Sequence, residues 1–458
     1  IIFTGFFTRV LSGTYLPLLV LPFNFIVLTA IYSLKFRKEQ TDLVLLYFKP
    51  GSPEENLYYH NQRKARFDKF KYLFPEFPFF GEWFINQGFE GKHTHKDDWK
   101  YAWDFVVVDE KKKQYSNDGD LLTDYFCFSL PIAAALDGEV VKVIASIPDN
   151  KIGDVNIRKN WGNTIILKHE HGLFSAISHL EADSIKLSEG DKVKKGDIIG
   201  KCGNSGRSPY PHIHFQFQTS DKLGEKTFEF PFAHFIVSKD DRYELKTFTY
   251  PKEGEIVRNV EIHKTINNAF LMRYGEKFKF EYEVEGENKI EEWEVKINMN
   301  SDKYIESSEG DIVVLYQTDK VFYLTSYVGN KKSALYYFYL LALRVPLCYQ
   351  QALHWNDEYS IAHLPTSWVR YASEFFLFFG EMLKAKGSFT YAEQPEDATS
   401  YTIRADIEAR GSSIFSFYSR KFSGELKIDP DNGIEGFEFY ENNKRIFSTK
   451  KIINEETQ

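Results

Sequence analysis

Between residues 86 and 235, short runs of β-branched and aromatic residues alternate with turn-forming residues. The turns are marked by Asp137-Gly138, by Gly162-Asn163 and by Glu189-Gly190-Asp191. Short strands separated by regular turns are typical of an antiparallel sandwich or half-barrel. An aromatic content of 17% also favours strands over helical bundles. We therefore expect a mainly β protein.

Composition predicts four segments in the 458 residues, enough chain for two or three domains. They are an apolar N-terminus at 1–38, a connector at 39–85, the strand-rich segment at 86–235 and an accessory β-rich domain at 236–458.

The accessory domain carries hairpin signals at 431–433 (DNG) and 441–443 (ENN). After Pro365, the run WVRYASEFFLFFGEMLKAK predicts one helix over about 367–386, which Gly387 can end. The aromatic run ALYYFYLLAL at 334–343 is too short to cross a membrane as a helix. It predicts a buried strand or a surface for a partner.

The N-terminus has no charged residue between Val10 and Leu34, a run long enough for a membrane span. Pro17, Pro22 and Asn24 weaken this interpretation, and a buried pair of strands is the alternative. We expect a membrane span. Basic residues are more frequent after the run than before it, which by itself would keep the following chain in the cytoplasm.

Net charge and cysteine content narrow the class of partner. A formal charge of −8 and a pI near 5.9 argue against nucleic acid. Cys127, Cys202 and Cys348 lie far apart and form no C-x-x-C pair, so they leave the redox compartment undecided.

The strongest chemical signal is the segment PHIHFQF at 211–217. Residues two apart on a strand share a face, so His212, His214 and Gln216 project to one side and the apolar residues between them to the other. Two imidazoles side by side on a rigid strand can form half of a metal site, or one ligand and one acid/base group. Taken alone, the pair can also be structural.

Further candidates lie in THKDDWKYAWDFVVV at 94–108. Asp104 stands within an apolar strand, where a carboxylate is costly unless it is paired or binds a metal. His95 precedes it across a polar loop. In isolation, a buried hydrogen-bonded carboxylate and a solvated loop histidine would explain both residues.

Four motifs follow in order over about 88–220: THKDDWKYAWDFVV, PIAAALDGEVVKV, GNTIILKHEHGLFSAISHL and LSEGDKVKKGDIIGKCGNSGRSPYPHIHFQF. In this order they resemble the lysostaphin/LytM zinc metallopeptidases, which share a duplicated hybrid motif. The resemblance implies one zinc ion bound by His95, Asp104 and His214, with an open position for water. It implies that His179 and His212 are catalytic, and their individual roles stay open.

The chain departs from the family pattern at one point. The family commonly separates its first histidine and aspartate by three residues, whereas eight residues separate His95 from Asp104. His93 is therefore the rival for the first ligand.

In the glycine-rich loop GNSGRS, three residues are candidates for contacts with substrate: Asn204, Arg207 and Ser208.

The apolar run also contains LPLLVLPFNF, which is similar to an element of urea transporters. Residues 1–38 could thus be the end of a bacterial urea transporter fused to the peptidase domain. The resemblances together imply a membrane-tethered zinc endopeptidase that cuts peptidoglycan stems or cross-links on the periplasmic or extracellular side of the bacterial cell membrane. The alternatives are an inactive module that binds cell wall or activates an amidase, and a sensor or scaffold fused to a transporter.

Overall fold

The computed structural model describes residues 73–239, 242–284, 287–364, 369, 372–373, 382–393 and 400–452. The expected membrane span, the resemblance to urea transporters and most of the connector fall on residues 1–72, outside this part of the chain. Across the described ranges, no helix combines the length and the apolar character that crossing a lipid bilayer requires.

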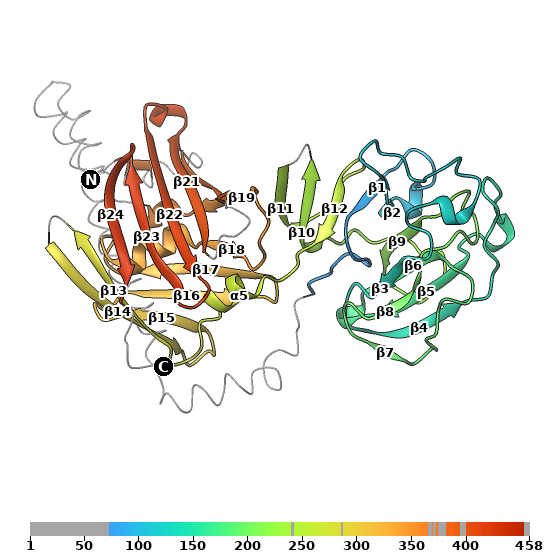
Figure 1. The fold of residues 1–458 in the computed structure, drawn as a ribbon, viewed down its shortest axis with the longest axis horizontal. Helices are drawn as coiled ribbons and strands as arrows, with labels where there is room; N and C mark the ends of the chain where they lie inside the picture. Colours follow the sequence, from blue (N-terminus) through green and yellow to red (C-terminus); the bar gives the residue numbers. More distant parts are fainter. Residues whose placement is uncertain are drawn as a thin grey trace, which may run out of the picture.

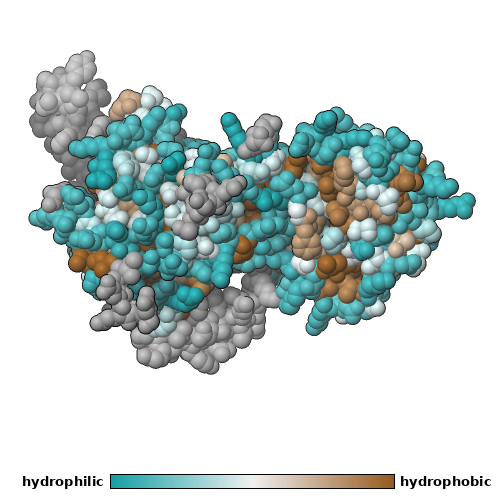
Figure 2. Space-filling model, in the orientation of Figure 1, coloured by the Kyte–Doolittle hydropathy of each residue, from teal (hydrophilic) through white to brown (hydrophobic). Residues whose placement is uncertain are grey.

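Strands dominate the described chain, which confirms the predicted mainly β class (Figure 1). An N-terminal lobe contains nine strands: β1 (Trp83–Gln87), β2 (Ala102–Val106), β3 (Pro131–Ala133), β4 (Gly138–Ile144), β5 (Asn163–Lys168), β6 (Phe174–Leu180), β7 (Lys192–Val193), β8 (Ile198–Lys201) and β9 (Ile213–Gln218). The predicted turns at 137–138, 162–163 and 189–191 precede β4, β5 and β7. In the view of Figure 2, this lobe shows more hydrophobic surface than the rest of the molecule.

The core of the N-terminal lobe extends beyond the predicted segment 86–235. Phe77, Phe79 and Trp83 pack into it from the preceding chain, and Val257 packs into it from the following chain. Strand β9 lies between β2 and β6 and is buried along its whole length. The domain boundaries remain predictions.

Three strands lie between the two lobes in Figure 1: β10 (Phe232–Lys239), β11 (Arg242–Thr249) and β12 (Ile256–Asn259). Strand β12 pairs with both β1 and β10, β10 pairs with β11, and β11 runs parallel to β19 over two residue pairs. These pairings carry backbone hydrogen bonds without interruption from one lobe to the other. A side-chain contact joins the lobes as well, because Lys195, in the turn after β7, donates at 2.7 Å to the carboxylate of Asp319, which lies in the turn after β16.

The C-terminal lobe is a curved antiparallel sheet that β24 closes onto β13. Its strands are β13 (Lys277–Val284), β14 (Glu287–Ile297), β15 (Lys303–Ser307), β16 (Ile312–Gln317), β17 (Val321–Val328), β18 (Arg344–Pro346), β19 (Leu353–Tyr359), β20 (Leu383–Tyr391), β21 (Tyr401–Gly411), β22 (Ser419–Asp429), β23 (Gly433–Glu441) and β24 (Lys444–Lys451). Two α-helices of this lobe have their bounds within the described residues, α5 (Lys264–Ala269) and α6 (Ala334–Leu341). Both predicted hairpins are confirmed, between β22 and β23 and between β23 and β24.

The run at 334–343 was predicted as a buried strand or a partner surface, and this is wrong. Residues Ala334–Leu341 form α6, and every one of them is buried in the core of the C-terminal lobe. The Ser333 side chain accepts from the backbone N–H of Tyr336, and the Glu291 carboxylate accepts from those of Ala334 and Leu335. Because the sheet surrounds this helix, it can be apolar on all sides.

The C-terminal end of the predicted helix at 367–386 is also wrong. Val369 and 372–373 are helical, and most of the predicted helix lies outside the described residues. From Leu383 onward the chain is strand β20, whose residues alternate between buried and exposed. Gly387 pairs with Asp357 in the middle of a ladder and ends no helix.

Candidate metal centre

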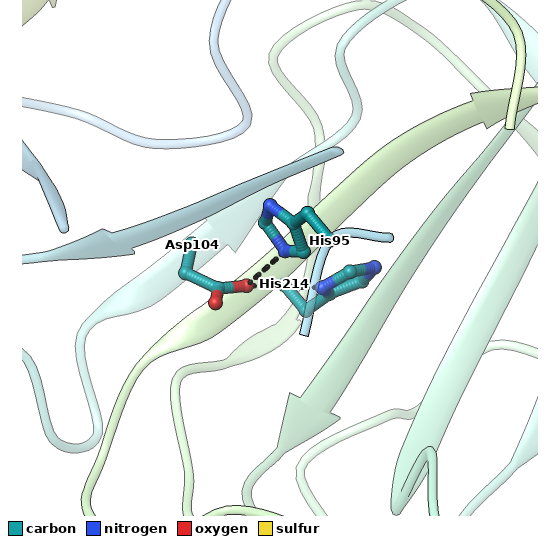
Figure 3. A group of neighbouring side chains, drawn as sticks. All are labelled: His95, Asp104 and His214. Atoms are coloured by element: carbon teal, nitrogen blue, oxygen red, sulfur yellow. Dashed lines mark hydrogen bonds and ion pairs between the residues drawn. The ribbon is translucent and has the colours of Figure 1, made fainter. Parts of the chain in front are cut away.

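Strand register brings the predicted ligands together. Asp104 on β2 lies directly opposite His214 on β9, and the loop before β2 brings His95 to the same place (Figure 3). Asp104 Oδ1 lies 2.9 Å from His214 Nδ1 and 3.2 Å from His95 Nε2. All three side chains are buried, and they are the one group of possible metal ligands found in the described ranges.

Gln87 fixes the orientation of Asp104 and holds the loop that carries His95. Its Oε1 accepts from the backbone N–H groups of His93 and Thr94, at 2.8 and 3.1 Å. Its Nε2 must then face away from them, and it donates to Asp104 Oδ2 at 2.8 Å. On His95, Nδ1–H donates to the carbonyl of Gly88 at 2.8 Å, which leaves Nε2 as a lone-pair donor toward Asp104.

A chain of amides fixes His214 in the same way. Gln218 Nε2 donates to the carbonyls of Ser220 and Lys222, so its Oε1 is free to accept from Gln216 Nε2 at 2.8 Å. The Oε1 of Gln216 then faces His214 Nε2 at 2.9 Å and requires a proton there. The Nδ1 of His214 is therefore unprotonated where it faces Asp104.

This donor set fits zinc. Two imidazole lone pairs and one carboxylate oxygen converge, and each imidazole donates its other N–H to a protein oxygen, as metal-bound histidines do. The two donor separations are close to the roughly 3.3 Å expected between ligands of a tetrahedral zinc ion.

Charges within the site are tightly coupled. Although burial opposes it, the charge and hydrogen bonds of Asp104 raise the pKa of His95. Burial also opposes ionisation of Asp104, but His95 and His214 hold the pKa of its carboxyl well below the usual range. A proton on His95 thus competes with a cation for Asp104.

The two predicted catalytic histidines lie beside this group. His179 on β6 and His212 just before β9 have ring centroids 4.7 Å apart, and that of His179 is 6.2 Å from the centroid of His214. His179 Nδ1–H donates to the carbonyl of Ser205 at 2.8 Å. His179 also has a φ of +64°, a left-handed conformation rare for a residue with a Cβ and commonest at functional sites.

His212 Nδ1–H likewise donates to the carbonyl of Tyr210 at 3.0 Å, so in both rings Nε2 is the nitrogen that remains to accept a proton. Burial lowers the pKa of both histidines, His179 well below its ordinary value, and for His179 the neighbouring histidines lower it further. Both are therefore neutral near pH 7, with Nε2 able to accept a proton.

The loop residues predicted to contact substrate divide into two kinds. Asn204 and Ser208 are fully buried, which corrects that prediction. The Ser208 hydroxyl contacts His212 Nδ1 at 3.0 Å and Asn204 Oδ1 at 2.7 Å, so the pair supports the histidine from inside the protein. Arg207 is exposed, and its contact with substrate stays a prediction.

The rival ligand His93 is exposed and does not join the group. Its backbone N–H is held by Gln87, two residues before the buried His95. The longer spacing to Asp104 is taken up by a 3-10 turn at Asp97–Trp99, so separation in sequence does not prevent convergence in space.

Several residues around the site were missed by sequence reasoning. Gln218 continues the alternation of His212, His214 and Gln216, so a signal for it existed. No pattern marked Gln87.

Aromatic side chains beside the histidines were missed as well. The ring of Trp161 lies 5.4 Å from that of His214, and the ring of Tyr210 lies 5.8 Å from that of His212.

The family model that matches, over residues 124–225, is that of Peptidase family M23. The chain therefore carries a peptidase M23 domain. The match includes His179, His212 and His214, whereas His95 and Asp104 precede it.

Relatives share this region. The chain is 27% identical to Endolysin 2638A of Staphylococcus phage 2638A over 140 residues, 29% of each protein. It is 31% identical to Peptidoglycan DD-endopeptidase ShyC of Vibrio cholerae over 111 residues, 24% of this chain and 22% of that protein. The chain thus spans less than a third of either relative.

Among solved structures, the catalytic domain of the M23 protein EnpA from Enterococcus faecalis is 20% identical. The alignment covers 33% of this chain and 92% of that domain, with a TM-score of 0.23. The suggested kinship of residues 1–38 with urea transporters has no support in these comparisons.

Proposed function

We propose that the chain is a zinc-dependent endopeptidase that hydrolyses peptide bonds of peptidoglycan. The observation that carries the proposal is the orientation of the three donors. An ionised carboxylate and two imidazole lone pairs point to the same place. Gln87 orients the carboxylate of Asp104, Gln216 and Gln218 orient His214, and the carbonyl of Gly88 orients His95. The relatives' names include a peptidoglycan endopeptidase, and this supports the choice of substrate.

In this proposal His95, Asp104 and His214 hold the zinc ion. When bound, zinc supplies Lewis acidity, which lowers the pKa of a water molecule and polarises a peptide carbonyl. A neutral imidazole with a free Nε2 accepts one proton of water as the water oxygen bonds to the carbonyl carbon. That proton then passes to the amide nitrogen as the C–N bond breaks. The products are a carboxylic acid and an amine, and transfer of the acid proton to the amine gives a carboxylate and an ammonium group. Either His179 or His212 can carry it.

The test combines metal analysis with digestion of purified cell wall, whose products are identified by mass. His214→Ala is expected to lose zinc and activity together. His212→Ala is expected to keep zinc and lose about 10²–10⁴-fold in rate, the usual worth of one acid/base group. His93→Ala, an exposed histidine of the same region, is the control and is expected to keep both.

Two results would contradict the proposal. A zinc-loaded wild type that releases no new amine from cell wall would be a binding module. A His212→Ala variant that loses zinc as fully as His214→Ala would refute the division of roles. The substrate also implies that the domain works outside the cytoplasmic membrane, and a reporter fused to the full-length protein that reads only in the cytoplasm would exclude this.

A further inference from the structure

The two histidines, in their neutral form, offer no hydrogen-bond donor to the carbonyl oxygen of a substrate. Each uses Nδ1–H to donate to a backbone carbonyl, of Ser205 for His179 and of Tyr210 for His212. In the neutral ring, Nε2 is then an acceptor. Neither histidine can donate to the carbonyl oxygen of a substrate before it has taken up a proton. A neutral donor that acts beside the Lewis acidity of zinc would therefore come from another side chain.

Tyr210 is placed to supply that donor. Its ring lies 5.8 Å from the ring of His212 and stacks at 6.4 Å on that of Tyr125, with an angle of 4° between the planes. Its hydroxyl oxygen accepts from Asn86 Nδ2 at 3.1 Å, and the other end of this amide accepts from Gln114 at 3.2 Å. The oxygen is therefore already an acceptor, and its proton is directed elsewhere.

The hydroxyl proton of Tyr210 meets no recorded acceptor among the residues that the structure describes. Asn86 is the bulged residue of β1 immediately before Gln87, which holds Asp104, so the hydroxyl is anchored at the edge of the metal centre. Burial raises the pKa of Tyr210, and the charge of the Asp104 carboxylate raises it further, whereas the hydrogen bond from Asn86 lowers it. The net shift is upward, so the phenol stays protonated.

We propose that Tyr210 is a catalytic hydrogen-bond donor, whose phenolic O–H stabilises the oxyanion that develops on the peptide carbonyl oxygen. This inference rests on the proposed peptidase function. As the water oxygen bonds to the carbon, the carbonyl π electrons move onto oxygen, and the phenol donates to that charge without giving up its proton. The contribution is largest where negative charge forms, so it acts on turnover more than on substrate binding.

The matched pair of variants is Tyr210→Phe and Tyr125→Phe in the full zinc-loaded chain. Each removes one hydroxyl from the same aromatic stack, and the proposal assigns a role only to that of Tyr210. Tyr210→Phe is expected to lower kcat on cell wall by roughly 10- to 100-fold, the worth of one hydrogen bond to a charged acceptor, with KM and zinc content unchanged. Tyr125→Phe is expected to match the wild type.

A second readout does not depend on cleavage. Inorganic phosphate presents a tetrahedral oxyanion, and calorimetry on the zinc-loaded chain measures its binding. Tyr210→Phe is expected to weaken this binding by a similar factor, and Tyr125→Phe is expected to leave it unchanged. Equal phosphate affinity and equal kcat in Tyr210→Phe and wild type would overturn the role of Tyr210. A wild type inactive on cell wall would instead overturn the proposed function, while phosphate binding still judges the donor.

Discussion

Replacing Gln87 tests whether the orientation of the ligands sets zinc affinity. Gln87→Leu keeps the size of the side chain but removes the donor to Asp104 Oδ2 and the acceptor for the N–H groups of His93 and Thr94. The carboxylate and the loop that carries His95 both lose their anchor. Loss of such a supporting contact weakens metal binding by about 10- to 100-fold, or roughly 1.4–2.7 kcal/mol.

The assay is competition for zinc against a chelator of known affinity, at fixed pH. Gln87→Glu separates the two functions, because it keeps an acceptor for the loop but sets a second carboxylate against Asp104. We expect it to weaken zinc binding at least as much as Gln87→Leu. The control is Gln114→Leu. The amide of Gln114 bonds to Asn86, which bonds to Tyr210, and it contacts none of the three proposed zinc ligands. If folded Gln87→Leu binds zinc like the wild type, the orientation argument is refuted.

Three further predictions concern other parts of the molecule. His95→Ala is expected to empty the metal site whereas His93→Ala leaves it filled, and equal zinc content in the two variants would reopen the ligand assignment. Gly162 has a φ of +62°, and a Cβ there would lie 2.4 Å from the Ser205 carbonyl oxygen that accepts from His179. Gly162→Ala should therefore cost about 1–3 kcal/mol of folding free energy, measured as a lower Tm. Its activity should fall by more than any loss of zinc explains. Burial lowers the pKa of His234 from 6.5 to about 4, so this histidine binds a proton more readily in the unfolded chain than in the folded one. Its contribution to the free energy of unfolding is intact above about pH 6.5. As the pH falls toward 4, the free energy of unfolding decreases by roughly 3 kcal/mol. Denaturant unfolding at pH 7 and 4.5 should show a smaller acid loss for His234→Phe than for wild type, and equal losses would contradict the assignment.

Strand alternation was enough to predict one face of the site. The i, i+2 pattern of His212, His214 and Gln216 predicted a shared face. In the structure His214 and Gln216 meet on one face of β9, and His212 lies just before the strand. What alternation cannot supply is the direction of hydrogen bonds. The relay from Gln218 depends on two backbone carbonyls in the following turn, and Gln87 acts from a strand whose pairing with β2 shifts by one residue at a bulge.

The failures in the C-terminal lobe have a common cause. A run of ten apolar residues has no period that distinguishes a buried helix from a buried strand. Glu291, which receives the first N–H groups of α6, precedes them by more than forty residues. In the opposite sense, Leu383–Lys386 favour a helix in isolation, but all four residues pair with β21, and Ala385 and Lys386 pair with β19 as well. Tertiary contacts decided both cases.

The ladder through β1, β12, β10, β11 and β19 has a mechanical consequence. Two domains joined by a flexible linker reorient independently, whereas domains joined by paired strands move as one body until a rung breaks. Two pairings in this series have only two residue pairs, that of β1 with β12 and that of β11 with β19. The second is the parallel contact at Tyr243–Leu353 and Glu244–His354. A pull on the C-terminal lobe would reach the N-terminal lobe through the rungs of β11 with β19 and through side-chain contacts such as the Lys195–Asp319 ion pair. The paired strands thus hold the proposed metal centre in a fixed orientation to the C-terminal lobe until one of these contacts breaks.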